Sequence, residues 1–118
     1  MRASSKKAKG RRLQQEVAQK ISEAIGLPCG QDQPIESRGM SQNGVDIRLD
    51  SEARKRFPYS VECKNQETWS LPAWIKQAQE NQMDGTDWMV VCSKNRTRAV
   101  VVLDIDVFFE LFKKSFQS

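Results

Sequence analysis

The stretch PYSVECKNQE, residues 58–67, alternates apolar and polar side chains and then runs into a polar loop. Alternate side chains of a strand point to opposite faces, so Glu62 and Lys64 share one face while Val61 and Cys63 share the other. An acid and an amine on one strand face fit an ordinary surface ion pair. They also fit half of a metal-dependent active site. The remaining sequence has to distinguish these interpretations.

Hydrophobic periodicity on both sides of this strand predicts a mixed α/β fold. Apolar residues at helical spacing predict a first helix from about Arg11 to Ile25. Ser70 is a candidate N-cap for a second helix that runs to about Met83, and Asp104 or Asp106 opens a last helix. The predicted strands are QPIES (33–37), VDIRLD (45–50), PYSVECK (58–64), WMVVCS (88–93) and AVVVLD (99–104).

The strands differ in their apolar patterns. VDIRLD alternates and predicts a half-buried strand, whereas the continuous apolar runs at 88–93 and 99–104 predict strands covered on both faces. SEARKR, residues 51–56, reads as a connection. We therefore expect a mixed sheet of about five strands flanked by helices, formed by one domain over residues 10–118 behind a disordered arm at 1–9.

Composition excludes several kinds of protein. The 118 residues include no histidine and three cysteines without C-x-x-C spacing, which argues against a structural zinc site and a histidine-activated cysteine nucleophile. No run of 18 apolar residues is present, and the first 12 residues lack the apolar core of a secretory signal. We expect a cytoplasmic protein with no membrane partner.

The net charge of +4 is concentrated at the amino terminus. Residues 1–12 carry six cations and no acid, and the 13 basic and 15 acidic residues that remain give a net charge of −2. A basic arm on a mildly acidic body is typical of a protein that contacts phosphates. The alternative is a solvated tail that aids solubility.

A second acid lies upstream of the opening stretch. Asp46 is on the polar face of the preceding predicted strand, 16 residues before Glu62 and just after a glycine-containing loop. Two carboxylates from adjacent strands can hold a hard divalent cation such as Mg²⁺, which would polarise a phosphate. Lys64 beside them could orient water or stabilise the charge that develops on phosphoryl oxygens. Glu-x-Lys alone is a short pattern with a real rate of chance matches.

GVDI at 44–47 followed by VECKNQE at 61–67, in this strand order, resembles the PD-(D/E)XK nuclease superfamily and its small Holliday-junction-resolvase-like members. KAKGRRLQQ (7–15), ARKRFPYSVECKNQE (53–67) and WIKQAQEN (74–81) are similar to small phage-encoded nucleases of that superfamily. The resemblance implies a restriction-endonuclease-like α-β-β-β-α-β core. It also implies a metal-dependent DNA endonuclease that uses Mg²⁺ or Mn²⁺.

The resemblance also implies roles for individual residues. Asp46 and Glu62 would be metal ligands, assisted by the backbone carbonyl of Cys63, and Lys64 would be the catalytic lysine. Gln77 matches a glutamine that related nucleases use near the active centre. Val45 stands where the proline of the family name would be, a departure common in the superfamily.

Further acids have two interpretations each. Junction resolvases carry a glutamate on the first helix that joins the metal site, which Glu16 would supply. The alternative is an ordinary helix-surface pair with Lys20 at i+4. Glu36 is a weaker candidate for an additional ligand.

Several cations and one aromatic residue are candidate DNA contacts. Trp69, in the loop after Lys64, is placed to stack on an unpaired base, and exposed cations in the arm and the turns would contact phosphates. The predicted contacts are Lys6, Lys7, Lys9, Arg11, Arg12, Arg38, Ser41, Trp69 and Arg96.

The last predicted helix carries apolar residues around some 200° of its surface, wider than a one-sided core contact needs. This width fits either pairing with a second copy or burial beneath the sheet. A homodimer would suit a branched DNA substrate cut on two strands.

The alternative functions are a non-catalytic DNA-binding protein with this fold, and a nuclease that acts on ordinary duplex DNA.

Overall fold

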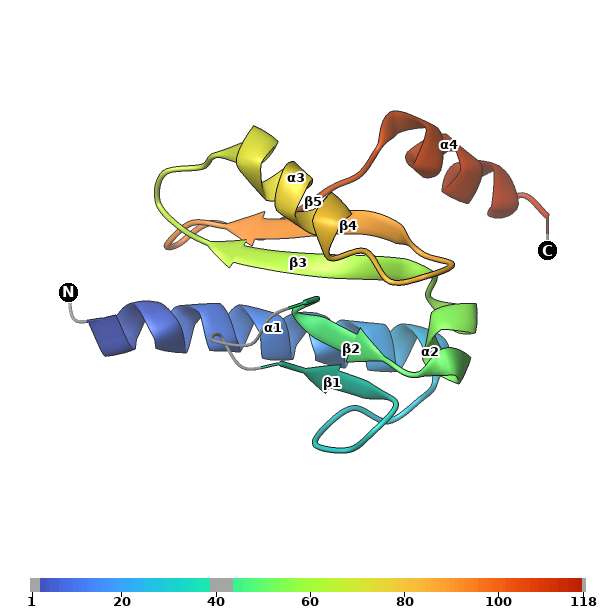
Figure 1. The fold of residues 1–118 in the computed structure, drawn as a ribbon, viewed down its shortest axis with the longest axis horizontal. Helices are drawn as coiled ribbons and strands as arrows, with labels where there is room; N and C mark the ends of the chain where they lie inside the picture. The colour runs from blue at the N-terminus through green and yellow to red at the C-terminus, as the bar shows by residue number, and fades with distance from the viewer. Residues whose placement is uncertain (1–2, 39–43, 118) are drawn as a thin grey trace.

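The computed structural model describes residues 3–38 and 44–117, with side chains from residue 7 onward (Figure 1). The predicted mixed α/β architecture is confirmed, with its strands divided between two sheets. The strands are β1 (Ile35–Ser37), β2 (Ile47–Leu49), β3 (Tyr59–Asn65), β4 (Asp87–Ser93) and β5 (Val100–Val102). The helices are α1 (Ala3–Ile25), α2 (Ser51–Arg56), α3 (Leu71–Glu80) and α4 (Ile105–Lys114).

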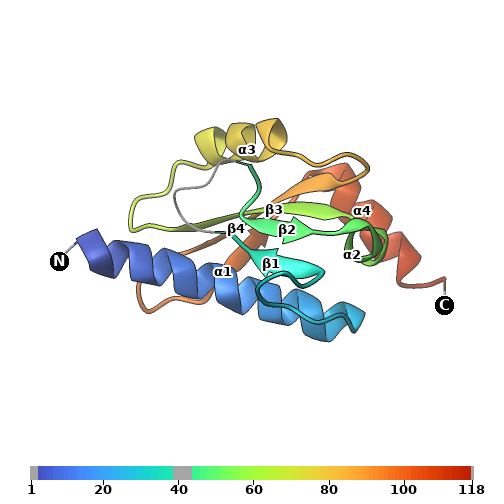
Figure 2. The same cartoon turned by 60° about the horizontal axis from the view of Figure 1, so that its bottom comes forward.

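The larger sheet has the order β3-β4-β5, with β3 parallel to β4 and β5 antiparallel to β4. Parallel neighbours require a crossover connection, which α3 provides between β3 and β4. Helix α1 packs on the face that carries Val61 and Val91, and α3 packs on the face that carries Val90 (Figures 1 and 2). Glu62 and Lys64 therefore lie on the α3 face of β3.

The smaller sheet lies beside the free edge of β3. Strands β1 and β2 pair antiparallel, and Glu36 is opposite Arg48 in the register. The two sheets meet just before β2, where the backbone N–H of Asp46 donates to the carbonyl of Val61 at 3.2 Å. This bond brings the first residues of VDIRLD against β3, which positions the site described below.

Helix α1 begins at Ala3 rather than near Arg11. Residues 3–9, expected to belong to a disordered arm, therefore have helical backbone. The segment is rich in alanine and lysine, both strong helix formers, and Gly10 costs only about 1 kcal/mol within a helix. Lys7 and Lys9 are thus carried on the same helix as Arg11 and Arg12.

The segment SEARKR is a helix, α2, and not the plain connection that was predicted. Asp50 caps this helix, because its side chain accepts a hydrogen bond from the N–H of Ala53 at 2.9 Å. Helix α3 ends at Glu80, three residues before the predicted end. Its Trp74 is buried, at 5% exposure, which fits its expected place in the core.

The two apolar strands at the carboxyl end have different environments. The last five residues of β4 are buried, as the continuous apolar run predicted. The same prediction is wrong for β5, because Val100 and Val101 are exposed at the edge of the sheet. The interpretation of the last helix as buried is also wrong, since α4 contains no buried residue. An apolar run predicts that a segment is buried, but it does not identify the element or molecule that covers the segment.

Candidate active site

The side chain of Asp46 continues the hydrogen bonding at the edge of β3. Its Oδ2 atom accepts a hydrogen bond from the backbone N–H of Cys63 at 2.7 Å, next to the bond between Asp46 N–H and Val61. The N–H and C=O of one strand residue point to the same edge, so the Cys63 carbonyl faces the Asp46 side. The Asp46 carboxylate and the Cys63 carbonyl therefore lie together at this edge of β3.

Glu62 is buried at 2% exposure on the α3 face of β3. Its Oε1 atom accepts a hydrogen bond from Asn81 Nδ2 at 3.4 Å, and Asn81 is the C-cap of α3. The chain that follows α3 is held over β3 by Ser60, the preceding residue on the same face of the strand. Ser60 Oγ accepts a hydrogen bond from the Met83 N–H at 2.8 Å and forms another with the Thr86 hydroxyl at 2.6 Å. These bonds fix the position of Asn81 over Glu62.

Burial raises the pKa values of both acids. Desolvation is the main cause for Glu62, and the nearby charge of Asp46 adds to it, so the pKa of Glu62 rises to about 7. Desolvation also raises the pKa of Asp46, although the Cys63 hydrogen bond and the charge of Lys64 oppose this shift. Two acids that resist ionisation together form a site where a cation would be strongly stabilising.

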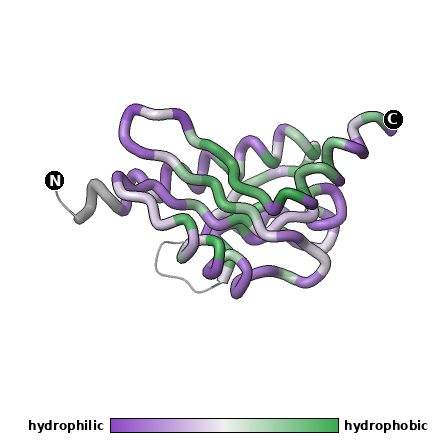
Figure 3. Tube along the Cα trace, turned by 90° about the horizontal axis from the view of Figure 1, so that it is seen from above, coloured by the Kyte–Doolittle hydropathy of each residue, from purple (hydrophilic) through white to green (hydrophobic). Residues whose placement is uncertain are grey.

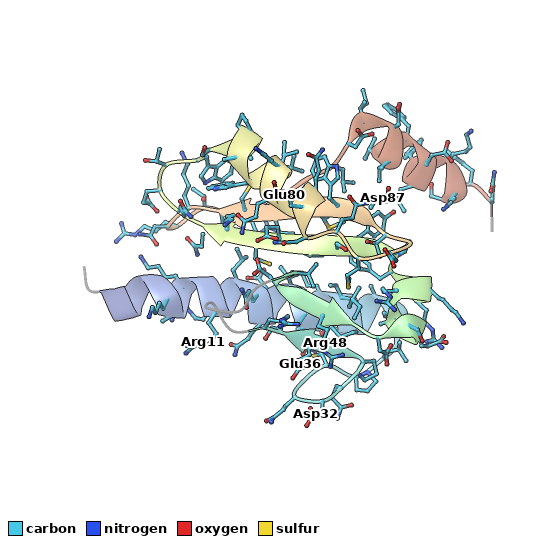
Figure 4. The ribbon with its side chains drawn as sticks, viewed as in Figure 1. Arg11, Asp32, Glu36, Arg48, Glu80 and Asp87 are labelled. Atoms are coloured by element: carbon cyan, nitrogen blue, oxygen red, sulfur yellow. The ribbon has the colours of Figure 1, made fainter. Side chains whose placement is uncertain are left out.

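The acids lie in one pocket of about 420 Å³ with most of the predicted catalytic residues. Asp46, Glu62, Cys63, Lys64 and Gln77 all line it. Sequence reasoning missed other lining residues, namely Gly10, Gln14, Asn65, Gln66, Glu80 and Asn81. A signal was present for two of them, since Glu80 and Asn81 follow Gln77 at the i+3 and i+4 spacing of one helix face. Figure 4 shows Glu80 on α3 above the sheet.

Glu16 does not line this pocket. It is an exposed residue of α1 that borders two other depressions, whereas Gly10 and the buried Gln14 are the residues of α1 that line the acidic pocket. Glu36 is also elsewhere, because it forms an ion pair with Arg48 at 2.8 Å across the β1–β2 pair (Figure 4). Hydrogen bonding from Arg48 lowers the pKa of Glu36. Neither glutamate joins Asp46 and Glu62.

Some predicted DNA contacts gather beside the pocket. Lys9 and Arg12 of α1 meet Lys94 and Arg96 of the β4–β5 turn around a second depression of about 310 Å³. Asn65 lines both this depression and the acidic pocket. We call the four cations the basic cluster.

Trp69 borders the same region through contacts with its neighbours. The Lys94 amine lies 5.5 Å from the centre of a Trp69 ring, and the indole N–H donates to the Gln66 carbonyl at 3.0 Å. Lys7 and Arg11 are exposed on α1, and the backbone N–H of Arg38 donates to the Asp46 carbonyl at 2.7 Å. Ser41 and the side chain of Lys6 lie outside the described residues.

The donor set fits a hard divalent cation that keeps several water ligands. No group of three or more His, Cys, Asp or Glu side chains among residues 3–38 and 44–117 is arranged to hold a metal. Mg²⁺, however, typically takes one or two carboxylates and completes its shell with water and substrate phosphate oxygens. Asp46, Glu62 and the Cys63 carbonyl would supply such a partial shell.

A family profile matches nearly the whole chain. The profile of the family described as "Phage putative PDDEXK endonuclease" matches residues 5–118. The chain belongs to this family of phage PD-(D/E)XK endonucleases. No curated protein and no solved structure matched the chain. Within the described segments, no helix is both long and apolar enough to cross a membrane.

Proposed function

We propose that the chain is a metal-dependent endonuclease that hydrolyses phosphodiester bonds in DNA. The observation that carries the proposal is the convergence of Asp46, Glu62 and Lys64 on one pocket of a family member. A surface ion pair would explain Glu62 and Lys64 alone. It would not explain a second, half-buried carboxylate held against the same strand by a backbone hydrogen bond.

Asp46, Glu62 and the Cys63 carbonyl would hold Mg²⁺ or Mn²⁺. Such a cation, when bound, polarises the scissile phosphate and lowers the pKa of a bound water. Lys64 lines the same pocket and lies near enough to affect the pKa values of both acids. Its amine would orient the attacking water or stabilise charge on the phosphate oxygens. Gln77 would position the substrate, and Asn81 would position Glu62.

The basic cluster would guide the DNA backbone to these acids. Lys9, Arg12, Lys94 and Arg96 surround a depression that shares Asn65 with the acidic pocket. A phosphate chain that crosses the cluster would therefore lead directly to Glu62. Further contacts to the same DNA strand would come from Lys7, Arg11 and the Arg38 side chain. Trp69 offers a ring face on which a base can stack.

The preferred substrate in this proposal is branched DNA such as a four-way junction, cut by a homodimer. The resemblance of GVDI and VECKNQE to junction-resolvase-like nucleases supports this choice. An open depression beside the site also suits a strand that leaves the duplex, since Trp69 could stack on an unpaired base. Cleavage of ordinary duplex DNA uses the same chemistry and is the second candidate.

The test is a cleavage assay on four substrates of matched sequence: a four-way junction, a flap, a duplex and a single strand. Each is incubated with Mg²⁺, Mn²⁺, Ca²⁺ or excess EDTA. We expect cleavage with Mg²⁺ or Mn²⁺, fastest on the junction, and binding without turnover with Ca²⁺. Undiminished cleavage in EDTA would contradict the metal requirement, and equal rates on the duplex would contradict branch preference.

Glu62→Gln and Glu23→Gln form a matched pair of variants for this assay. Both remove one carboxylate, but Glu62 is buried in the pocket and Glu23 is exposed on α1. We expect Glu62→Gln to bind DNA without cutting it and Glu23→Gln to cut at the parent rate. A parent protein that binds DNA but never cuts any substrate would support the non-catalytic alternative.

A further inference from the structure

Strand β5 and helix α4 present the large exposed hydrophobic residues of the described chain. The exposed fractions run from 43% for Leu111 to 76% for Phe116. Figure 3 shows the hydrophobic positions along this carboxyl-terminal segment. We define the β5–α4 surface as Val100, Val101, Ile105, Phe108, Phe109, Leu111, Phe112 and Phe116.

The phenylalanines of this surface form one continuous group. Phe108 contacts Phe109 and Phe112, with ring centres 5.1 and 6.3 Å apart, and Phe112 contacts Phe116 at 5.2 Å. The attachment to the body is slight, because Leu103 and Val107 are the residues of this segment that pack partly against the α1-side core. In Figure 1, α4 extends from the sheet on the side away from α1.

The area of the surface is too large for a solvent-facing patch. Four of the eight residues are phenylalanines, with roughly 150–250 Å² each to bury, and the other four are smaller aliphatic residues. Their exposed fractions together amount to about 800 Å². Monomers rarely expose a continuous apolar patch above about 300–600 Å². About 800 Å² per partner is the area of a standard protein interface.

The same chain carries an apolar groove next to this surface. The groove has a volume of about 560 Å³ and lies between α1 and the sheet, with Val17, Ile21, Met89, Val91 and Val101 among its lining residues. Val101 belongs to both the groove and the β5–α4 surface, so the two are continuous. Charges of both signs occur on each side. Lys20, Arg98 and Glu16 line the groove, while α4 carries Asp106 in its first turn and Lys113 and Lys114 in its last, so an inserted α4 can direct its acidic first turn toward Lys20 and Arg98.

We propose that the β5–α4 surface is a two-fold interface with a second copy of this chain. In this arrangement, α4 of each copy covers β5 and enters the α1–β5 groove of the other. A two-fold contact requires a surface that complements itself, which an apolar helix and an apolar groove on one molecule provide. Residues of the acidic pocket are absent from both the β5–α4 surface and the groove, so the contact leaves the acidic pocket of each copy uncovered. The groove does adjoin the depression of the basic cluster, with which it shares Glu16, Thr97 and Ala99.

This inference deepens the homodimer part of the proposed function and rests on it. Its test is separate from nuclease chemistry, because the oligomeric state is measured without DNA or metal. Sedimentation equilibrium at micromolar concentrations should give twice the chain mass of 13.5 kDa for the parent. A parent that stays monomeric would overturn the interface even if cleavage is observed, and a dimer that cannot cut would leave the interface standing.

Two charge variants and a groove variant locate the contact. Phe109→Lys and Phe112→Lys should be monomeric and keep the parent circular dichroism spectrum, because both side chains are more than half exposed. Gln15→Lys adds the same charge on the exposed face of α1 and should stay dimeric. Ala24→Trp would fill the groove from an exposed position and should also give monomers. Lysine variants that dimerise like the parent would overturn the interface, and a dimeric Ala24→Trp would overturn the placement of α4 in the groove.

Discussion

The backbone N–H of Cys63 donates to the Oδ2 atom of Asp46 across 2.7 Å, so a side chain extends the hydrogen bonding of β3 at its free edge. The bond has two consequences for the site. It satisfies an N–H group that would otherwise lack a partner at the sheet edge, and it fixes one oxygen of Asp46 beside Glu62. The structural and proposed catalytic roles of Asp46 are therefore separable by substitution.

Asp46→Asn and Asp46→Ala should differ in stability and agree in activity. The asparagine side chain can still accept the Cys63 hydrogen bond, whereas alanine leaves that N–H unsatisfied at a cost of about 1–3 kcal/mol. Neither variant keeps the carboxylate that would bind the metal, so both should lose most cleavage. Urea unfolding in EDTA beside a cleavage assay measures the two effects. Equal stability of the two variants would show that the hydrogen bond contributes little.

Lys64→Ala should leave folding nearly unchanged and remove most cleavage. The half-buried lysine stands at the pocket, and an ordinary ion pair at such a position contributes at most about 1 kcal/mol. A double variant that combines Lys64→Ala with Asp46→Asn or Glu62→Gln should lose little more activity than either single variant, because each change disables the same proposed metal-and-water site. The measurements are cleavage rate, melting temperature and DNA affinity of the single and double variants. A Lys64→Ala protein that cuts at the parent rate would make the Glu62–Lys64 pair an ordinary strand feature.

Stability without metal should depend on pH through Glu62. Its pKa of about 7 in the folded protein, against the usual 4.5, means that the folded state holds a proton that the unfolded chain releases. This contribution is complete below about pH 4.5 and is lost as the pH rises through about 7, which amounts to roughly 3 kcal/mol. Glu62→Gln lacks it.

The comparison of the parent with Glu62→Gln isolates this effect from the other acids. In EDTA, the free energy of unfolding of the parent should fall relative to that of the variant between about pH 5 and pH 8. Saturating Mg²⁺ should reverse the trend for the parent alone, since the cation replaces the proton. A difference between the two proteins that does not change with pH would show that Glu62 ionises normally.

The basic cluster should set the salt dependence of DNA binding. Replacing Lys94 by Gln and Arg96 by Asn should lower the slope of log K against log salt by roughly 1–2, since each phosphate contact contributes about 0.9. Asparagine suits position 96 because the backbone there has φ of 60°. Lys55→Gln with Lys76→Gln removes the same charge from residues that line neither the acidic pocket nor the depression of the basic cluster, and should leave the slope unchanged. Binding titrations at several salt concentrations compare the two double variants.

The sequence by itself determined most of the helices and strands and the candidate site residues Asp46, Glu62 and Lys64. Alternation in VDIRLD and PYSVECK predicts strands because the side-chain period of a strand is two residues, and the same alternation puts Glu62 and Lys64 on one face. The predicted strands were all found, with bounds that differ by a few residues. The short helix at 51–56 was missed although Asp50 was an available N-cap signal.

Only the tertiary structure decided which residues reach the pocket. Glu16 and Gln14 are two positions apart on α1, and the rotation of the helix against the sheet turns Gln14 inward and leaves Glu16 outside. The pairing of Glu36 with Arg48 depends on the register of β1 and β2, which local periodicity does not encode. Likewise, the apolar pattern of α4 requires burial in some partner, but a pattern along one chain carries no information on whether that partner is the same sheet or a second molecule.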